Sequence, residues 1–170
     1  IDLKELVDNL QLRGISLPIL IRFGEILKHR LGEMHQAFQN AIAEHNYKSA
    51  YCCVYPIKVN QQRQVVEEVF EYGRKYKFGL EAGSKPELLA VLAIADNETP
   101  IICNGFKDDE YIEMVMLAKK IGRQIIPVVE KYTELELSLK HSARVGVRPV
   151  IGLRIKLASS GSGRRKSSDG

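Results

Sequence analysis

The feature that most constrains the fold is an alternation of short apolar runs with longer amphipathic stretches. The apolar runs are rich in Ile, Val and Leu, and they predict strands over residues 17–21, 50–55, 78–81, 101–103, 125–129 and 150–155. Because the runs lack polar alternation, we expect strands that are buried on both faces, as in a parallel sheet covered by helices. The sequence therefore predicts an α/β fold with right-handed crossovers.

The stretches between the runs carry helix starts and ends. Four N-termini are predicted, from Asn60 and Asp108 as single caps and from Ser84 with Glu87 and Thr133 with Glu136 as capping boxes. Gly122 is placed to end one helix in the left-handed conformation, and the helix from about Glu134 is expected to end before Gly146.

Polar residues recur where the predicted strands end. They are Lys58, Glu81, Asn104, Glu130 and Lys156, at spacings of 23, 23, 26 and 26 residues. Such even spacing is more typical of a (β/α) barrel than of a doubly wound sheet. Since six of the eight strands of a TIM-type barrel are present, we expect residues 1–170 to be an incomplete barrel domain, truncated before the barrel closes.

Charge and composition exclude several classes of protein. The net charge of +4 comes from residues 154–170, so the rest of the 170-residue chain is neutral and lacks the basic face of a nucleic-acid binder. No apolar stretch is long enough to span a membrane and no secretion signal is visible, which predicts a cytoplasmic protein. Cys52, Cys53 and Cys103 form no CxxC pair and are expected to be reduced, buried residues.

Lys58 is the most unusual of the strand-end residues. It follows eight uncharged residues, 50–57, so its amine is expected to emerge from a buried strand into the barrel mouth. Desolvation lowers the pKa of a lysine, and a neutral amine condenses with an aldehyde. The alternative is an ion pair between Lys58 and Glu81 of the neighbouring strand.

Residues 55–62, with the sequence Tyr-Pro-Ile-Lys-Val-Asn-Gln-Gln, resemble the pyridoxal-phosphate lysine motif of the biosynthetic arginine decarboxylases. These enzymes belong to the fold-type III pyridoxal-phosphate-dependent family, whose cofactor-binding domain is an alanine-racemase-like barrel. Further segments that resemble this family, in the same order, are residues 20–23, 79–88, 102–108 and 157–163.

The resemblance implies a function and a site. Lys58 would form the internal aldimine with pyridoxal 5'-phosphate, and Glu81 and Arg154 would lie in the cofactor pocket. The full-length enzyme would convert L-arginine to agmatine and CO2 in polyamine (putrescine and spermidine) biosynthesis, and is expected to be a homo-oligomer. Magnesium is implied by the resemblance alone, since no carboxylate cluster here has ligand spacing.

Several of these residues also have a purely structural interpretation. Glu81 could serve only to neutralise Lys58, Arg154 could belong to an ion pair in the barrel interior, and Asn60 is more often a helix cap than a ligand. Residues 161–163, Gly-Ser-Gly, are interpreted as a loop rather than a phosphate cradle because no helix follows them.

The chain also departs from the family. Residues 164–166, Arg-Arg-Lys, stand near the place where the family has an aromatic residue and a double glycine. The ring-stacking histidine, the glycine-rich phosphate loop, the carboxylate at the pyridine nitrogen and the C-terminal β domain are all absent. We therefore expect the isolated chain to lack decarboxylase activity. The alternatives are a non-catalytic barrel that binds pyridoxal phosphate, a decarboxylase of another basic amino acid, and a fragment that self-associates through unpaired strand edges.

Overall fold

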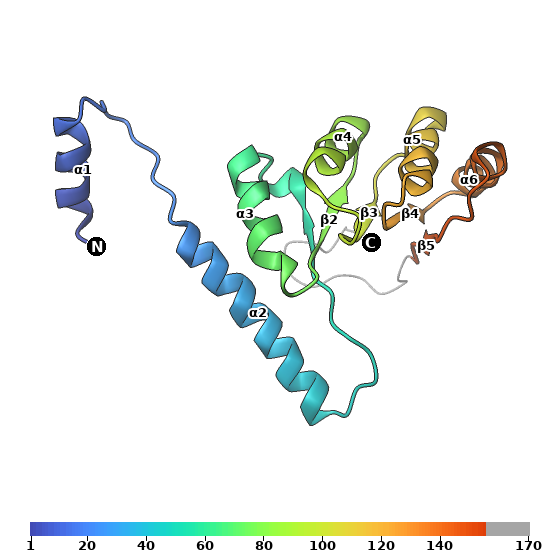
Figure 1. The fold of residues 1–170 in the computed structure, drawn as a ribbon, viewed down its shortest axis with the longest axis horizontal. Helices are drawn as coiled ribbons and strands as arrows, with labels where there is room; N and C mark the ends of the chain where they lie inside the picture. The colour runs from blue at the N-terminus through green and yellow to red at the C-terminus, as the bar shows by residue number, and fades with distance from the viewer. Residues whose placement is uncertain (156–170) are drawn as a thin grey trace, which may run out of the picture.

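Five short parallel strands form one sheet in the computed structural model, which describes residues 1–155 (Figure 1). The strands are β1 (Val54–Pro56), β2 (Gly79–Ala82), β3 (Ile101–Cys103), β4 (Ile125–Val129) and β5 (Gly152–Leu153). The helices are α1 (Leu3–Leu12), α2 (Gly24–Glu44), α3 (Arg63–Arg74), α4 (Lys85–Ile94), α5 (Asp109–Lys120) and α6 (Tyr132–Val145), and the 3-10 turn η1 (Ile57–Val59) follows β1.

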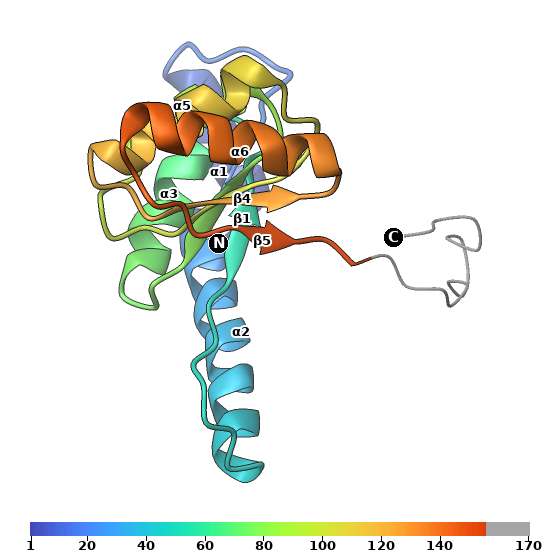
Figure 2. The same cartoon turned by 90° about the vertical axis from the view of Figure 1, so that its right-hand side faces the viewer.

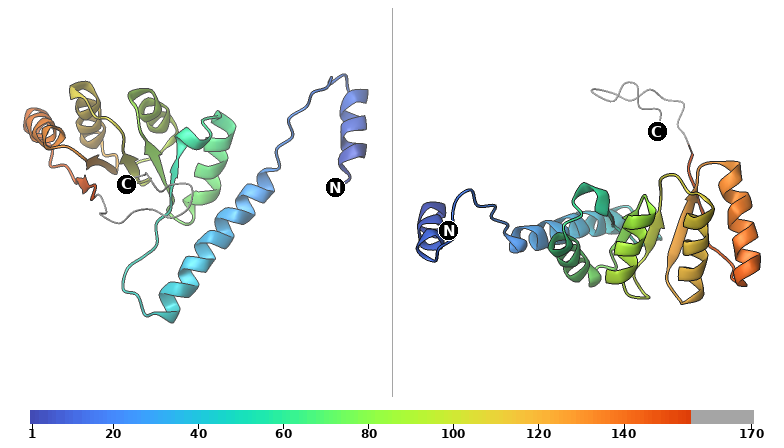
Figure 3. Two further views of the ribbon diagram at one scale, coloured as in Figure 1. Left: turned by 180° about the vertical axis from the view of Figure 1, so that it is seen from behind. Right: turned by 90° about the horizontal axis from the view of Figure 1, so that it is seen from above.

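The strand order identifies the sheet as part of a barrel wall. The strands follow one another as β1-β2-β3-β4-β5, and each pair is parallel. The crossover helices α3, α4, α5 and α6 form an arc along one side of the sheet in Figure 1 and in the left panel of Figure 3. Since a doubly wound sheet reverses its order and carries helices on both faces, the predicted incomplete (β/α) barrel is confirmed.

The two faces of the sheet differ in burial, and here the prediction of strands buried on both faces is wrong. In β4, Ile125 and Val129 are buried while Ile126 and Val128 are half-buried. The buried face packs on the helices: Leu80 and Ile101 lie in one core with Leu88 and Ile112 of α4 and α5, as members of a larger apolar cluster. The opposite, concave face is less buried because the helices cover only one side.

The predicted first strand, residues 17–21, is also wrong. This run is an irregular segment between α1 and α2, and no strand of the described sheet pairs with it. Leu17 and Leu20 are 57% and 74% exposed. Both panels of Figure 3 show α1 standing apart from the sheet, so the run has no neighbouring strand to complete its hydrogen bonds. The sheet therefore has five described strands rather than six.

Two of the predicted helix starts and both predicted ends are confirmed. The Asp108 side chain accepts a hydrogen bond from the Tyr111 backbone N–H at 2.9 Å, and the Ser84 hydroxyl accepts one from the Glu87 N–H at 3.4 Å. Gly122 and Gly146 end α5 and α6 with φ of +96° and +73°.

The other two helix starts are wrong. The Asn60 side chain accepts a hydrogen bond from the Gln62 N–H, but Gln62 is the residue that precedes α3. Helix α6 begins at Tyr132, so Thr133 lies inside its first turn. The earlier start has a physical cause, because the Glu134 carboxylate accepts hydrogen bonds from the Glu130 and Lys131 N–H groups ahead of the helix.

Helix α2 attaches to the rest of the chain through aromatic side chains. It packs against α3 and extends away from the sheet, as Figure 2 shows. The His35 ring stacks on Tyr76 with centroids 4.4 Å apart, and Phe38 stacks on Tyr51 at 3.9 Å. None of the helices in residues 1–155 combines the length and apolar composition of a membrane span.

The three cysteines are free, as predicted, but they differ in burial. Cys103 is buried in the core, and this burial raises the pKa of its thiol to about 12. Cys53 is half-buried and Cys52 is exposed, so the prediction of buried residues holds for Cys103 alone.

Asp109 of α5 contacts two basic side chains of α6, and these contacts make the stability of the protein depend on pH. Its Oδ1 lies 2.7 Å from Lys140 Nζ and 3.0 Å from His141 Nε2, and these partners, Lys140 first, lower its pKa from 3.8 to about 2. Because the folded-state pKa is depressed, the stabilisation is present above about pH 4 and is lost as the pH falls towards 2. We expect Asp109→Asn to lower the urea midpoint at pH 6 and to match the wild type near pH 2. A difference that stays constant between pH 6 and pH 2 would contradict this assignment.

Candidate functional site

The carboxyl ends of the five strands lie along one edge of the sheet, because all strands run in the same direction. In parallel α/β folds this edge carries the reacting groups. Three of the sequence-predicted positions, Lys58, Glu81 and Arg154, lie at this edge within the described residues. Lys156 and residues 157–170 lie outside the described part.

Lys58 is in the turn that follows β1. Its neighbour Ile57 is 2% exposed and anchors η1 in the core, while Lys58 itself is exposed. The Tyr55 hydroxyl donates a hydrogen bond to the Asn60 carbonyl at 3.3 Å and closes the turn around Lys58. The expectation that the Lys58 amine is desolvated is therefore wrong within residues 1–155, because Lys58 is exposed to solvent in this turn.

Glu81 lies on the strand next to Lys58. It pairs in register with Pro56 of β1 and Ile102 of β3. Its neighbours Leu80 and Ala82 are buried towards the helices, so strand alternation directs the half-buried Glu81 to the concave face. Within residues 1–155 no ion pair joins Glu81 to Lys58, so neither the predicted Lys58–Glu81 pair nor a purely neutralising role for Glu81 is seen.

Arg154 follows β5 and is held at two points. Its backbone N–H donates to the Val129 carbonyl at 3.0 Å, and its Nη1 lies 3.1 Å from Glu130 Oε1. This ion pair is the structural interpretation that the sequence left open, although the pair is partly exposed rather than interior. Lys58 follows β1 and Arg154 follows β5, the two outer strands of the described sheet, whereas Glu81 lies on β2, the strand beside β1.

The other lysines at this edge have partners. Lys85 binds Asp108 at 2.8 Å and Glu110 at 2.7 Å, and these carboxylates raise its pKa. Lys107 forms an ion pair with Glu134, and the Lys131 ammonium lies 5.1 Å from the centre of the Phe106 ring. In the described part of the chain, Lys58 has neither an ion pair nor an aromatic partner.

Sequence reasoning missed the ion pair between Lys107 and Glu134. Their charged atoms are 3.4 Å apart, and their side chains are only 0% and 4% exposed. The only available signal was that both residues lie in the segments that follow β3 and β4. A lysine in such a loop is ordinarily solvated, and neither residue type predicts burial.

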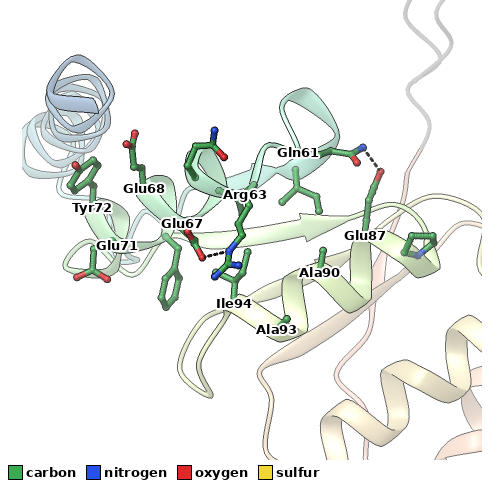
Figure 4. A pocket seen from close by; sticks show the side chains of 15 residues that line it. Gln61, Arg63, Glu67, Glu68, Glu71, Tyr72, Glu87, Ala90, Ala93 and Ile94 are labelled. Atoms are coloured by element: carbon green, nitrogen blue, oxygen red, sulfur yellow. Dashed lines mark hydrogen bonds and ion pairs between the residues drawn. The ribbon is translucent and has the colours of Figure 1, made fainter. Parts of the chain in front are cut away.

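One cavity lies away from this edge. Figure 4 shows a groove between α3 and α4, of about 1050 Å³, with the Gln61–Glu87 hydrogen bond at one end. Lys58, Glu81 and Arg154 do not line it. The groove lies on the helix side of the sheet and is separate from the concave face where strand-end chemistry is expected.

Most of the chain matches a known family. Residues 29–170 match the family described as "Pyridoxal-dependent decarboxylase, pyridoxal binding domain". The match covers most of the chain and contains all three predicted site residues.

Individual relatives carry a more specific description. The chain is 55% identical to a "Biosynthetic arginine decarboxylase" of Rhodopirellula baltica and 53% identical to one of Bacteroides thetaiotaomicron. These matches cover 100% of this chain but 25% and 27% of the relatives. The chain thus spans about a quarter of the length of these curated relatives.

A solved structure has the same fold. The biosynthetic arginine decarboxylase SpeA from Campylobacter jejuni matches with a TM-score of 0.82 and 34% sequence identity. The match covers 88% of this chain and 25% of that chain. The described half-barrel therefore corresponds to one part of a larger architecture.

Proposed function

We propose, from the premise that this chain belongs to the pyridoxal-dependent decarboxylase family, that it is the cofactor-binding part of an arginine decarboxylase. The proposal assigns residues 1–170 to the N-terminal part of a longer protein, with a barrel that is completed by later residues. The substrate is L-arginine and the products are agmatine, a precursor of polyamines, and CO2. The named relatives support this choice of substrate.

One observation carries the cofactor proposal: Lys58 is the lysine at the carboxyl edge for which residues 1–155 supply no partner. A primary amine without a partner in the turn after β1, with the half-buried Glu81 on the neighbouring strand β2, is a donor set that fits an aldehyde cofactor. The residues present therefore fit pyridoxal 5'-phosphate.

Each of the three residues has a distinct role in the proposal. Lys58 would hold the cofactor, because its primary amine is the kind of nucleophile that condenses with an aldehyde. Glu81 would supply a negative charge and a hydrogen-bond acceptor from the neighbouring strand. Arg154, oriented by Glu130, offers N–H groups to an anionic oxygen. When bound, pyridoxal phosphate supplies the electron sink that stabilises the carbanion left by decarboxylation.

The test is release of labelled CO2 from arginine labelled in its carboxyl carbon. We expect the complete protein to release CO2 from arginine in preference to lysine or ornithine, and the 170-residue chain alone to release none. Preferential release from lysine or ornithine would favour a decarboxylase of another basic amino acid. Cofactor uptake without release from any of the three would favour a non-catalytic barrel.

Two further expectations concern the oligomeric state and magnesium. Homo-oligomer formation by the complete protein remains part of the proposal, and mass photometry of that protein would measure it. Magnesium finds no support in residues 1–155, where no three His, Cys, Asp or Glu side chains gather into a metal site.

A further inference from the structure

The buried ion pair between Lys107 and Glu134 joins two loops at the carboxyl edge. Lys107 lies in the loop after β3, and Glu134 lies in the first turn of α6, after β4. Removing both charges from water is costly, and apolar residues of similar size often stabilise a protein as well or better. Stability therefore does not by itself explain this pair.

Glu134 fixes the backbone that carries Glu130. Its Oε2 accepts hydrogen bonds from the Glu130 N–H at 2.8 Å and the Lys131 N–H at 3.4 Å, and it is the oxygen that faces the Lys107 ammonium. Its Oε1 accepts the Lys107 N–H at 3.4 Å. One buried carboxylate thus ties the end of β4 to the loop after β3.

Glu130, whose backbone Glu134 holds, in turn binds Arg154. The Glu130 side chain binds the Arg154 guanidinium, and the backbone of Arg154 is bound to Val129 at the end of the same strand. Within residues 1–155 only Nη1 of the guanidinium has a carboxylate partner. A shift of Glu130 would therefore move the N–H groups that Arg154 offers to a ligand.

Lys107 also connects the ion pair to the loop that follows Glu81. The Lys107 ammonium donates to the Gly105 carbonyl, and a Cβ at Gly105 would lie 2.2 Å from the Gly83 carbonyl oxygen. Gly83 follows Glu81 by two residues, and its N–H donates to Glu87 at 2.6 Å. Direct contacts therefore run from the loop beside Glu81, through Lys107 and Glu134, to Arg154.

We propose that Lys107 and Glu134 are positioning residues that set the spacing between Glu81 and Arg154 and thereby the geometry in which an anionic aldehyde cofactor is held. This inference rests on the proposed function. Neither residue touches the cofactor: both act through Glu130 and Arg154. The buried pair suits this role because a charge pair fixes direction and distance, whereas apolar contacts tolerate sliding.

A double-mutant cycle in the complete protein tests the inference. Lys107→Met is expected to raise the Kd for pyridoxal 5'-phosphate about tenfold. In a Glu130→Gln background the same substitution is expected to raise the Kd less than about twofold, because its effect on the cofactor acts through Glu130. The matched control is Lys140→Met, which breaks an exposed ion pair between α5 and α6 and is expected to leave the Kd unchanged. Additive effects of Lys107→Met and Glu130→Gln would overturn the inference.

Hydrogen exchange of the cofactor-free protein gives a second readout. Lys107→Met is expected to speed exchange at the Glu130 and Arg154 amides, and Lys140→Met is not. Unchanged exchange, or faster exchange with an unchanged Kd, contradicts the positioning role. A wild-type protein that takes up no pyridoxal phosphate contradicts the proposed function and this inference together, whereas uptake that Lys107→Met leaves unaffected contradicts the inference alone.

Discussion

Lys58→Ala is expected to abolish the reducible attachment of pyridoxal 5'-phosphate and to lower decarboxylation by the complete protein at least about a thousandfold. The reason is that no other lysine at the carboxyl edge of residues 1–155 is free of a charged or aromatic partner. Borohydride reduction of the loaded protein, followed by peptide mass spectrometry, measures the attachment directly. The wild type should gain the mass of the reduced cofactor on the peptide that contains Lys58.

Lys85→Ala is the matched control for this experiment. Lys85 is the first residue of α4, which follows the neighbouring strand β2, but Asp108 and Glu110 hold its ammonium. The Lys85→Ala protein is expected to keep the adduct on Lys58. An adduct that persists on a different lysine after Lys58→Ala would remove the site assignment.

Gly105→Ala is expected to destabilise the protein by about 3 kcal/mol or more, which corresponds to a fall in Tm of about 6–12 °C. Gly105 has φ of +74°, where an L side chain is strained, and its added Cβ would meet the Gly83 carbonyl oxygen at 2.2 Å. The clash forces apart the loops after β2 and β3, and these loops flank Glu81. Thermal unfolding followed by circular dichroism measures the change.

Gly146→Ala separates the cost of the left-handed backbone conformation from the cost of the steric clash. Gly146 has a similar φ of +73°, but an added Cβ there meets no atom within 4 Å. We therefore expect only the cost of the left-handed conformation, about 1–2 kcal/mol. Equal losses of Tm in the two variants would show that the loops after β2 and β3 are not packed against each other.

The strands that were predicted correctly are those in which local pattern and tertiary environment agree. Residues 101–103 and 125–129 form β3 and β4 with the predicted bounds. Both strands have a partner on each side, and each is followed by a helix that covers it. In the interior of the sheet an apolar run is therefore sufficient to identify a strand.

The run at residues 17–21 shows why the same pattern fails elsewhere. Its composition resembles that of β4, yet its side chains are largely exposed and no described strand lies beside it. Strand formation depends on a partner that supplies hydrogen bonds, and composition carries no information about that partner. The ends of β1 and β5, which have one neighbour each, were likewise predicted too long.

The positions of the site residues were predictable from the sequence, but their contacts were not. Lys58, Glu81 and Arg154 lie after β1, at β2 and after β5 because strand ends can be read from apolar runs. Their ion pairs depend on side-chain geometry across loops that are distant in sequence. The Lys107–Glu134 pair joins residues 27 apart, and the burial that makes it notable has no local signature.

The sequential order of the strands has a consequence for how the protein is made. Each strand hydrogen-bonds to the one synthesised just before it, and paired residues such as Leu80 and Ile101, or Val54 and Gly79, are separated by only 21 to 25 positions. Closing such short stretches carries a small entropic cost. Each of the strands β2 to β5 therefore has a partner that has already been synthesised, and none of these four has to wait for a later segment of the chain.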